Sequence, residues 1–406
     1  MIRSSPTRAR ASAIVAAIGL AWSGGCWVDP SPTACRPGGP SPASAPGLAP
    51  LADDGEPVAP PAPGPPPRPL APPIPPEPSS ADGGGDLARR GGDELAATAG
   101  RLAAEGRWAE AARFQYWASK AGAAGEYDLA RWTGLAGDVE AAFYRLQEAA
   151  LGDGVDASWA DQDPGLAALR KDPRWKGQVE PFLRRCNASW AASGHRQTVL
   201  VVPAGYRPGT PIAVVVGLHG RGDRPDRFLD PATFQPLADE LGMAFVGVSG
   251  TLAIGRRSFL WSEDPAADAE HIRRALGDLS GRLTPRPGRR IALGFSQGGQ
   301  VGFADPGEYR GAIVMSPGAT RRFHRLAGLS PSAANHGQGF VCLCGAGEAA
   351  GNLGFTRSDA DFARRAGARV ELRLAEGQAA HAPPADLAAS LARWLRFVDA
   401  EAPKPE

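Results

Sequence analysis

The chain has 406 residues, which is enough for two folded domains or for one domain with long extensions. Its 44 Lys and Arg residues balance its 43 Asp and Glu residues, and this excludes the strongly basic surface typical of a nucleic-acid-binding protein. Its five cysteines, at positions 26, 35, 186, 342 and 344, have neither metal-ligand spacing nor the even number of a disulfide framework.

Residues 1–26 have the pattern of an export signal. Three arginines lie within the first ten residues, and the apolar stretch 11–22 is too short to span a bilayer. The segment ends in Ser-Gly-Gly-Cys26, which resembles a bacterial lipobox with Ser in place of the usual Leu. We expect export and lipid attachment at Cys26. The alternative is an ordinary cysteine beside the cleavage site of a soluble signal.

Residues 27–90 form the second predicted segment, a disordered linker rich in Pro and Gly. Half of the chain's 40 prolines lie in 27–80. Such a run forms neither helices nor strand ladders, and it adopts an extended, semi-rigid conformation. After a lipidated cysteine it would hold a domain away from a membrane. The alternative is a proline-rich ligand for an aromatic groove.

Residues 91–190 are rich in Ala and have helical periodicity. We expect one helix from Asp93, a candidate N-cap, and a second over 106–121. Gly106 and Trp108 recur 31 positions later as Gly137 and Val139, which resembles the roughly 34-residue period of tetratricopeptide repeats. Two interpretations stay open: a groove for a peptide or protein partner, or a structural helical cap.

Residues 191–400 alternate between strands and helices, the pattern of an α/β domain with a mostly parallel sheet. The strands are expected at 197–203, 212–218, 243–248, 290–293, 311–315, 340–344 and 369–374. The helices are expected at 231–241, 266–283, 357–366 and 384–398, with a short one at 299–305.

The strand at 290–293 runs into Gly294-Phe-Ser-Gln-Gly298, a G-x-S-x-G sequence. This pattern is typical of a nucleophile elbow, a tight strand-to-helix turn that holds its central Ser in strained backbone geometry. Glycine is needed two residues before and two after the Ser because a Cβ there would collide with neighbouring backbone. Ser296 is therefore the candidate nucleophile, at a helix N-terminus that favours a developing oxyanion.

Other motifs accompany the elbow, namely Val201-Val-Pro-Ala-Gly-Tyr206, Gly217-Leu-His-Gly-Arg-Gly222, Trp261 before an acidic helix, and Ser316-Pro-Gly318. Together with Gly294-Phe-Ser-Gln-Gly-Gly299 they resemble bacterial serine esterases of the phospholipase/carboxylesterase type, over 194–398. The resemblance implies an α/β-hydrolase fold and hydrolysis of small-molecule carboxylic esters without a cofactor.

In this fold the catalytic residues follow the order Ser, acid, His. His381 follows the last predicted strand and is the candidate base, although three residues separate it from Gly377 where the family has two. Glu348 is the candidate acid, in Gly345-Ala-Gly-Glu348 where the family has Gly-x-x-Asp. Asp359 and Asp361 on the next helix are the alternatives to Glu348.

The oxyanion hole of this fold uses the backbone N–H after the nucleophile and a second one from an early loop. These are Gln297 and either Gly220 or Arg221. His219 resembles the family's structural His, which braces that loop.

The sequence has no H-E-x-x-H motif, no paired cysteines of zinc-site type and no calcium loop, so we expect neither a metal nor a cofactor. We expect no nucleic-acid partner, and membrane contact only through the lipid anchor. The predicted location is the bacterial cell envelope, lipid-anchored or else periplasmic or secreted. Two rival functions are a catalytically degenerate surface adaptor and a serine peptidase acting on small peptides.

Overall fold

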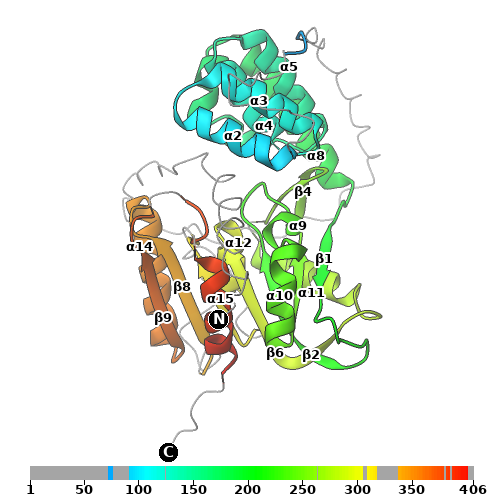
Figure 1. Ribbon diagram of the computed structural model, residues 1–406, viewed down its shortest axis with the longest axis vertical. Helices are drawn as coiled ribbons and strands as arrows, with labels where there is room; N and C mark the ends of the chain where they lie inside the picture. Colours follow the sequence, from blue (N-terminus) through cyan, green and yellow to red (C-terminus); the bar gives the residue numbers. More distant parts are fainter. Residues whose placement is uncertain are drawn as a thin grey trace, which may run out of the picture.

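The computed structural model describes residues 72–75, 91–123, 125–262, 264–304, 309–317, 337–378, 381–384 and 386–400. The predicted export signal, Cys26 and most of the predicted linker lie outside these ranges and stay predictions. None of the helices within them combines the length and the apolar character needed to cross a membrane. The described residues form a helical lobe and, at one end of it, an α/β lobe (Figure 1).

The helical lobe begins with two helical hairpins. The first consists of α2 (Gly92–Ala104) and α3 (Trp108–Lys120), and the second of α4 (Glu126–Leu135) and α5 (Val139–Leu151). The recurring Gly106 and Gly137 have φ values of 75° and 96° in the two hairpin turns, and glycine adopts this left-handed conformation without steric cost. The tetratricopeptide assignment stays a prediction. The expected N-cap at Asp93 is wrong, because Gly91 caps α2 and Asp93 lies in its first turn.

Shorter elements complete this lobe: α6 (Ala157–Ala160), η3 (Pro164–Leu166), α7 (Ala167–Arg170), η4 (Trp175–Val179) and α8 (Glu180–Ala192). They pack on the second hairpin around Trp175, whose side chain is fully buried. Ala is frequent at the buried positions of the hairpins, so their helices can approach closely. The lobe therefore has a hydrophobic core of its own.

The α/β lobe is built on a seven-stranded sheet in the order β1-β3-β2-β6-β7-β8-β9. Its strands are β1 (Thr198–Val201), β2 (Pro211–Leu218), β3 (Met243–Val248), β6 (Thr284–Phe295), β7 (Gly311–Met315), β8 (Gly339–Gly345) and β9 (Arg369–Ala375). Only β1 pairs antiparallel with its neighbour, and the other six strands are parallel. The predicted mostly parallel sheet is confirmed.

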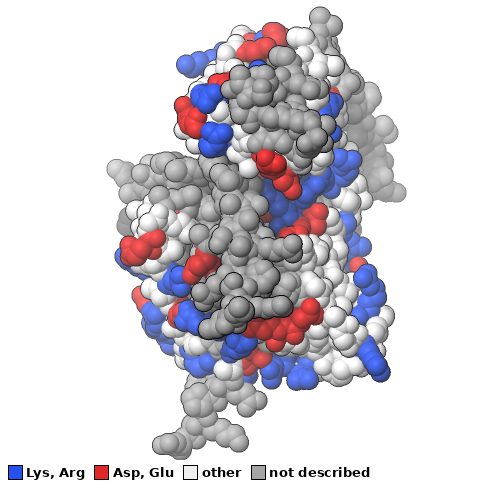
Figure 2. Space-filling model, viewed as in Figure 1, with Lys and Arg blue, Asp and Glu red and all other residues white. Residues whose placement is uncertain are grey.

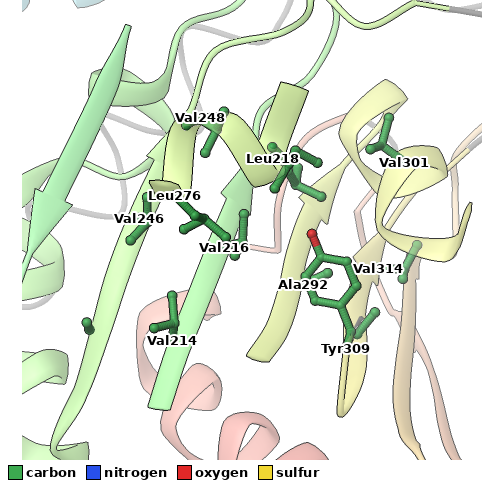
Figure 3. Packing of buried hydrophobic residues seen from close by; sticks show 14 of the residues in the cluster. Val214, Val216, Leu218, Val246, Val248, Leu276, Ala292, Val301, Tyr309 and Val314 are labelled. Atoms are coloured by element: carbon green, nitrogen blue, oxygen red, sulfur yellow. The ribbon is translucent and has the colours of Figure 1, made fainter. Parts of the chain in front are cut away.

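Helices cover both faces of this sheet. They are α9 (Pro225–Phe228), α10 (Pro231–Leu241), α11 (Pro265–Gly277), α12 (Gln297–Ala304), α14 (Ala350–Arg365) and α15 (Leu387–Asp399). Alternate residues of β2 point to opposite faces, so Val214 and Val216 pack with α11 and α14 while Val215 packs with α10 and α15. The first of these two clusters is drawn in Figure 3. Burial on both faces explains the unbroken apolar runs of the central strands.

Several boundaries differ from the sequence prediction. β6 begins at Thr284 rather than at 290, because Pro285 still pairs with the edge of β2 across a register shift. α11 ends at Gly277 rather than at 283, and α14 begins at Ala350 rather than at 357. The hairpin of β4 (Leu252–Gly255) and β5 (Ser258–Leu260) was not predicted from the sequence.

Candidate active site

Ser296 lies in the turn between β6 and α12. Its φ is 52°, in the left-handed region that non-glycine residues seldom adopt. A Cβ on Gly294 would lie 2.4 Å from the carbonyl oxygen of Gly298, and a Cβ on Gly298 would lie 2.1 Å from that of Leu218. Only glycine fits at either position, so the turn is held tight and the Ser296 hydroxyl stands at the start of α12.

His381 lies between the side chains of Ser296 and Glu348. Its Nε2 is 3.0 Å from Ser296 Oγ, and its Nδ1 is 2.8 Å from Glu348 Oε2. The imidazole packs on Phe295, with the ring centroids 4.9 Å apart. The structure therefore brings together the three residues that the sequence put forward, in the order Ser, acid, His. The additional residue before His381 does not prevent its contact with Ser296.

Glu348 is held by more than the histidine. Its Oε1 accepts hydrogen bonds from Ser316 Oγ at 2.6 Å and from the Gly345 N–H at 3.1 Å, and its Oε2 accepts one from Asn352 Nδ2 at 2.9 Å. Burial acts to raise the pKa of Glu348, but the hydrogen bonds from His381 and Ser316 outweigh it and lower the pKa. The carboxylate is thus charged near neutral pH and aimed at the imidazole.

The two alternative acids lie elsewhere on α14. Asp361 is exposed and accepts a hydrogen bond from Arg364 at 2.9 Å. Asp359 is buried, close enough to Cys342 to help raise the pKa of that thiol. Glu348 is the carboxylate that meets His381.

Ser316 and Asn352 are site residues to which the sequence analysis gave no role. Ser316 follows β7 and has a φ of 44°, so it shares the strained backbone of the nucleophile. Its place in the Ser316-Pro-Gly318 motif was the available signal. Asn352 lies four residues after Glu348 on α14, with its Nδ2 3.2 Å from His381 Nδ1. Nothing in the sequence singles it out.

The expected oxyanion donors follow two neighbouring strands, Gly220 and Arg221 after β2 and Gln297 after β6. Leu218, the last residue of β2, pairs with Gly294 of the neighbouring parallel strand β6. Beyond the paired strands, a Cβ on Gly298 would lie 2.1 Å from the carbonyl oxygen of Leu218 and 2.5 Å from that of His219. The Gln297 side chain is held in place by the backbone of Trp261, with which it exchanges hydrogen bonds of 3.1 and 3.0 Å. The loop 219–222, called here the oxyanion loop, therefore lies alongside the nucleophile turn.

A mostly parallel sheet, with one antiparallel edge strand and a strained serine between its central strand and the following helix, matches one known architecture. The fold is that of an α/β-hydrolase.

No family model matches this chain, and neither does any curated protein. Among solved structures, a Bacillus cereus carboxylesterase is similar at 16% identity and a TM-score of 0.39, over 52% of this chain and 97% of that one. Esterase 2 of Thermogutta terrifontis with bound propionate is similar at 19% identity and a TM-score of 0.39, over 52% and 92%. An uncharacterised Bacillus cereus protein is similar at 15% identity and a TM-score of 0.39, over 75% and 98%.

In this α/β-hydrolase fold His219 is the first residue of the oxyanion loop, and its side chain has no exposed surface. Its Nδ1 is 2.6 Å from the Gly220 carbonyl oxygen, and its Nε2 accepts a hydrogen bond of 2.8 Å from the Gly250 N–H. Burial lowers its pKa, so the ring is neutral and donates from Nδ1. The Trp261 indole also donates to the His219 carbonyl oxygen at 2.9 Å. These contacts fix the backbone at the start of the loop.

A metal site was not expected, and the described parts of the chain contain no group of three His, Cys, Asp or Glu side chains able to hold a metal ion. Cys342 and Cys344 are free thiols in the buried strand β8. Burial raises the pKa of Cys344 to about 11, so this thiol is protonated at neutral pH and is a poor nucleophile.

Proposed function

We propose that the protein is a serine hydrolase that cleaves carboxylic esters of small molecules through an acyl-enzyme intermediate. One observation carries this proposal: the unbroken contact from Ser296 Oγ to His381 Nε2 at 3.0 Å and from His381 Nδ1 to Glu348 at 2.8 Å. A nucleophile, a base within hydrogen-bond reach and a third group that orients the base are the requirements of covalent acyl transfer.

In the first half-reaction Ser296 Oγ attacks the carbonyl carbon of the ester while His381 Nε2 accepts the hydroxyl proton. Glu348 holds the Nδ1 proton of His381 and stabilises the imidazolium that forms. The carbonyl oxygen becomes an oxyanion, and the backbone N–H groups of Gln297 and of Gly220 or Arg221 donate to it. The tetrahedral intermediate collapses, the C–O bond of the ester breaks, and the leaving alcohol takes the proton from His381.

In the second half-reaction a water molecule replaces the alcohol. His381 accepts one of its protons as the water oxygen attacks the acyl carbon bound to Ser296 Oγ. Collapse of this second intermediate releases the carboxylic acid and returns the proton to Ser296. The enzyme ends unchanged, so no cofactor is consumed.

The same contacts distinguish between the rival functions. A degenerate adaptor has no need of a charged, buried Glu348 held by three donors besides His381, so the geometry favours an enzyme. A serine peptidase would use the same groups, because ester and amide cleavage share one acyl-enzyme route. The ester is preferred on the resemblance of the sequence motifs to serine esterases.

The proposal extends to the part of the chain before residue 91. An export signal and a lipid on Cys26 would place the hydrolase in the cell envelope on a proline-rich spacer, with the helical lobe available to a peptide or protein partner. Metabolic labelling with an alkyne-bearing fatty acid in a bacterial host tests the anchor, since Cys26→Ser should abolish the label.

The activity is tested with a fluorophosphonate probe and with nitrophenyl esters of graded acyl length. We expect the wild type to be labelled and to hydrolyse the esters, and Ser296→Ala and His381→Ala to lose both properties. Ser280→Ala is the matched control, because Ser280 is exposed in a turn after α11. Folded wild-type protein that neither reacts with the probe nor hydrolyses any ester would refute the proposal.

A further inference from the structure

The oxyanion loop is bound by a residue of the helical lobe. The Nε of Arg221 donates to Asp156 Oδ2, and its Nη2 donates to Ser158 Oγ at 2.5 Å. The Asp156 side chain is 9% exposed and that of Arg221 is 30% exposed. A largely buried, forked contact of this kind is stronger and more directional than an exposed ion pair.

Asp156 is itself fixed in place. Its Oδ1 accepts hydrogen bonds from the Ser158 N–H at 3.0 Å and the Trp159 N–H at 3.2 Å, so the side chain also caps α6. Asn187 of α8 holds the surrounding backbone, because it donates to the Val155 carbonyl oxygen at 2.7 Å and accepts from the Ala157 N–H at 3.0 Å. The carboxylate that binds Arg221 is therefore a rigid anchor.

The two lobes are in close backbone contact beside this anchor. A Cβ on Gly154 would lie 2.7 Å from the Cα of Gly255 in β4, so each backbone lies directly against the other. The Arg256 N–H donates across the junction to the Gly152 carbonyl oxygen at 3.1 Å. Figure 2 shows basic side chains gathered at the junction of the lobes with acidic side chains next to them.

The β4–β5 hairpin that forms this junction also holds the oxyanion loop. The Gly222 N–H donates to the Phe259 carbonyl oxygen at 2.9 Å, and the Phe259 N–H donates to that of Asp223 at 3.1 Å. Ser258 Oγ donates to the Gly222 carbonyl oxygen at 2.8 Å. The end of the loop is thus attached to the hairpin, while Arg221 in its middle is attached to Asp156.

We propose that Asp156 is a positioning residue for ester hydrolysis: it holds Arg221 so that the oxyanion loop presents its backbone N–H to the developing oxyanion. The helical lobe then forms part of the catalytic apparatus. This inference rests on the proposed function, since it concerns the oxyanion hole of the same site.

A positioning role predicts a particular kinetic change. Misplacing an oxyanion donor weakens a contact made in the transition state, so kcat falls while KM stays unchanged. Complete loss of one donor costs about 10²–10³ in kcat, and displacement of a donor that is still present costs less. We expect Asp156→Asn to lower kcat about tenfold, since Asn keeps the cap of α6 but loses the charge that binds Arg221.

The experiment measures kcat and KM for a nitrophenyl ester, together with the thermal midpoint, for the full chain and its variants. Asp153→Asn is the matched control, because Asp153 pairs with Arg256 across the same junction at 3.6 Å, whereas Asp156 pairs with Arg221 of the oxyanion loop. We expect it to match the wild type. Arg221→Ala keeps its backbone N–H and should lose kcat as Asp156→Asn does. The double variant Asp156→Asn/Arg221→Ala should have the same kcat as Arg221→Ala alone, because both substitutions break the same contact.

The outcomes separate this inference from the function on which it rests. The positioning role is refuted, and the hydrolase stands, if the wild type is active and Asp156→Asn has the same kcat as Asp153→Asn. It is also refuted if the fold-losses in kcat of Asp156→Asn and Arg221→Ala multiply in the double variant. If the wild type neither hydrolyses esters nor binds the fluorophosphonate, both proposals fall. Should Asp156→Asn not fold, Arg221→Ala carries the same test, because it breaks the contact from the other side and leaves the Asp156 cap of α6 in place.

Discussion

Replacing Glu348 by Gln tests the acid of the proposed triad without changing its size. The carboxylate accepts four hydrogen bonds, and Gln brings two N–H donors into this set of acceptor positions. If the amide nitrogen takes the place of Oε1, it meets the backbone N–H of Gly345, which cannot turn away. If it takes the place of Oε2, it meets His381 Nδ1 and the Asn352 amide, and the amide can flip. We therefore expect the nitrogen to face the histidine.

That orientation imposes the wrong tautomer on His381. Nδ1 must accept from the introduced glutamine amide, so the proton moves to Nε2, which then cannot take the proton of Ser296. The same change in the aspartate of a serine protease lowers kcat about 10⁴-fold with the geometry intact. We expect a loss of about 10³–10⁴ in kcat, which corresponds to about 4–5.5 kcal/mol in the activation free energy. KM should stay within a few-fold of the wild type.

The assay is steady-state hydrolysis of a short-chain nitrophenyl ester near neutral pH, with thermal unfolding as a check on the fold. Glu376→Gln is the control, because Glu376 lies in the turn after β9 and is exposed. A folded Glu348→Gln variant that keeps more than a tenth of the wild-type kcat would contradict this assignment of the acid.

Three further variants test the surroundings of the site. Ser316→Ala removes a charge-assisted hydrogen bond to Glu348. Because the pKa of Glu348 is lower in the folded state, its charge stabilises the fold above the unfolded-state pKa, and this stabilisation is lost as pH falls through the folded-state pKa. Urea unfolding of the variant should therefore show a loss of about 2 kcal/mol in the free energy of unfolding at pH 7, and a smaller loss towards pH 3. Gly298→Ala puts a Cβ 2.1 Å from the backbone oxygen of Leu218, so soluble yield and probe labelling should both collapse, and a stable, active variant would contradict the tight turn. Burial raises the pKa of Asp268 to about 6, so the free energy of unfolding of the wild type should fall as pH rises from about 5 to about 8. Urea unfolding at both pH values should show that Asp268→Asn makes this fall smaller by about 1.4 kcal/mol.

The parts of the site that the sequence predicts are those set by local geometry. Gly294 and Gly298 are specified by the turn itself, so the position of Ser296 follows from five consecutive residues. The parallel strands follow from unbroken apolar runs, and the chain order then indicates where a histidine should stand. The assignment of His381 needed no knowledge of side-chain contacts.

Most of the missing parts depend on pairings between distant segments. Ser316 lies 32 residues before Glu348, and only the packing of β7 beside β8 brings the two side chains together. Asn352 is four residues from Glu348, but no motif distinguishes it. Asp156 lies 65 residues before Arg221, in a lobe with a separate hydrophobic core. No periodicity or motif encodes such a contact, because it follows from how the two lobes pack.

The two departures from the esterase pattern lie on loops that touch each other. Glu348 follows β8 and Gln378 follows the neighbouring parallel strand β9, and the Gly347 N–H donates to the Gln378 carbonyl oxygen at 2.8 Å. Gly345 has no room for a side chain, because a Cβ would lie 2.6 Å from that same oxygen. An aspartate at 348 would withdraw the carboxylate by about 1.5 Å, the length of one C–C bond, and break its contact with Nδ1. The extra methylene of Glu348 therefore brings its carboxylate to His381, and the hydrogen bond from Gly347 to Gln378 joins the two loops that carry these residues.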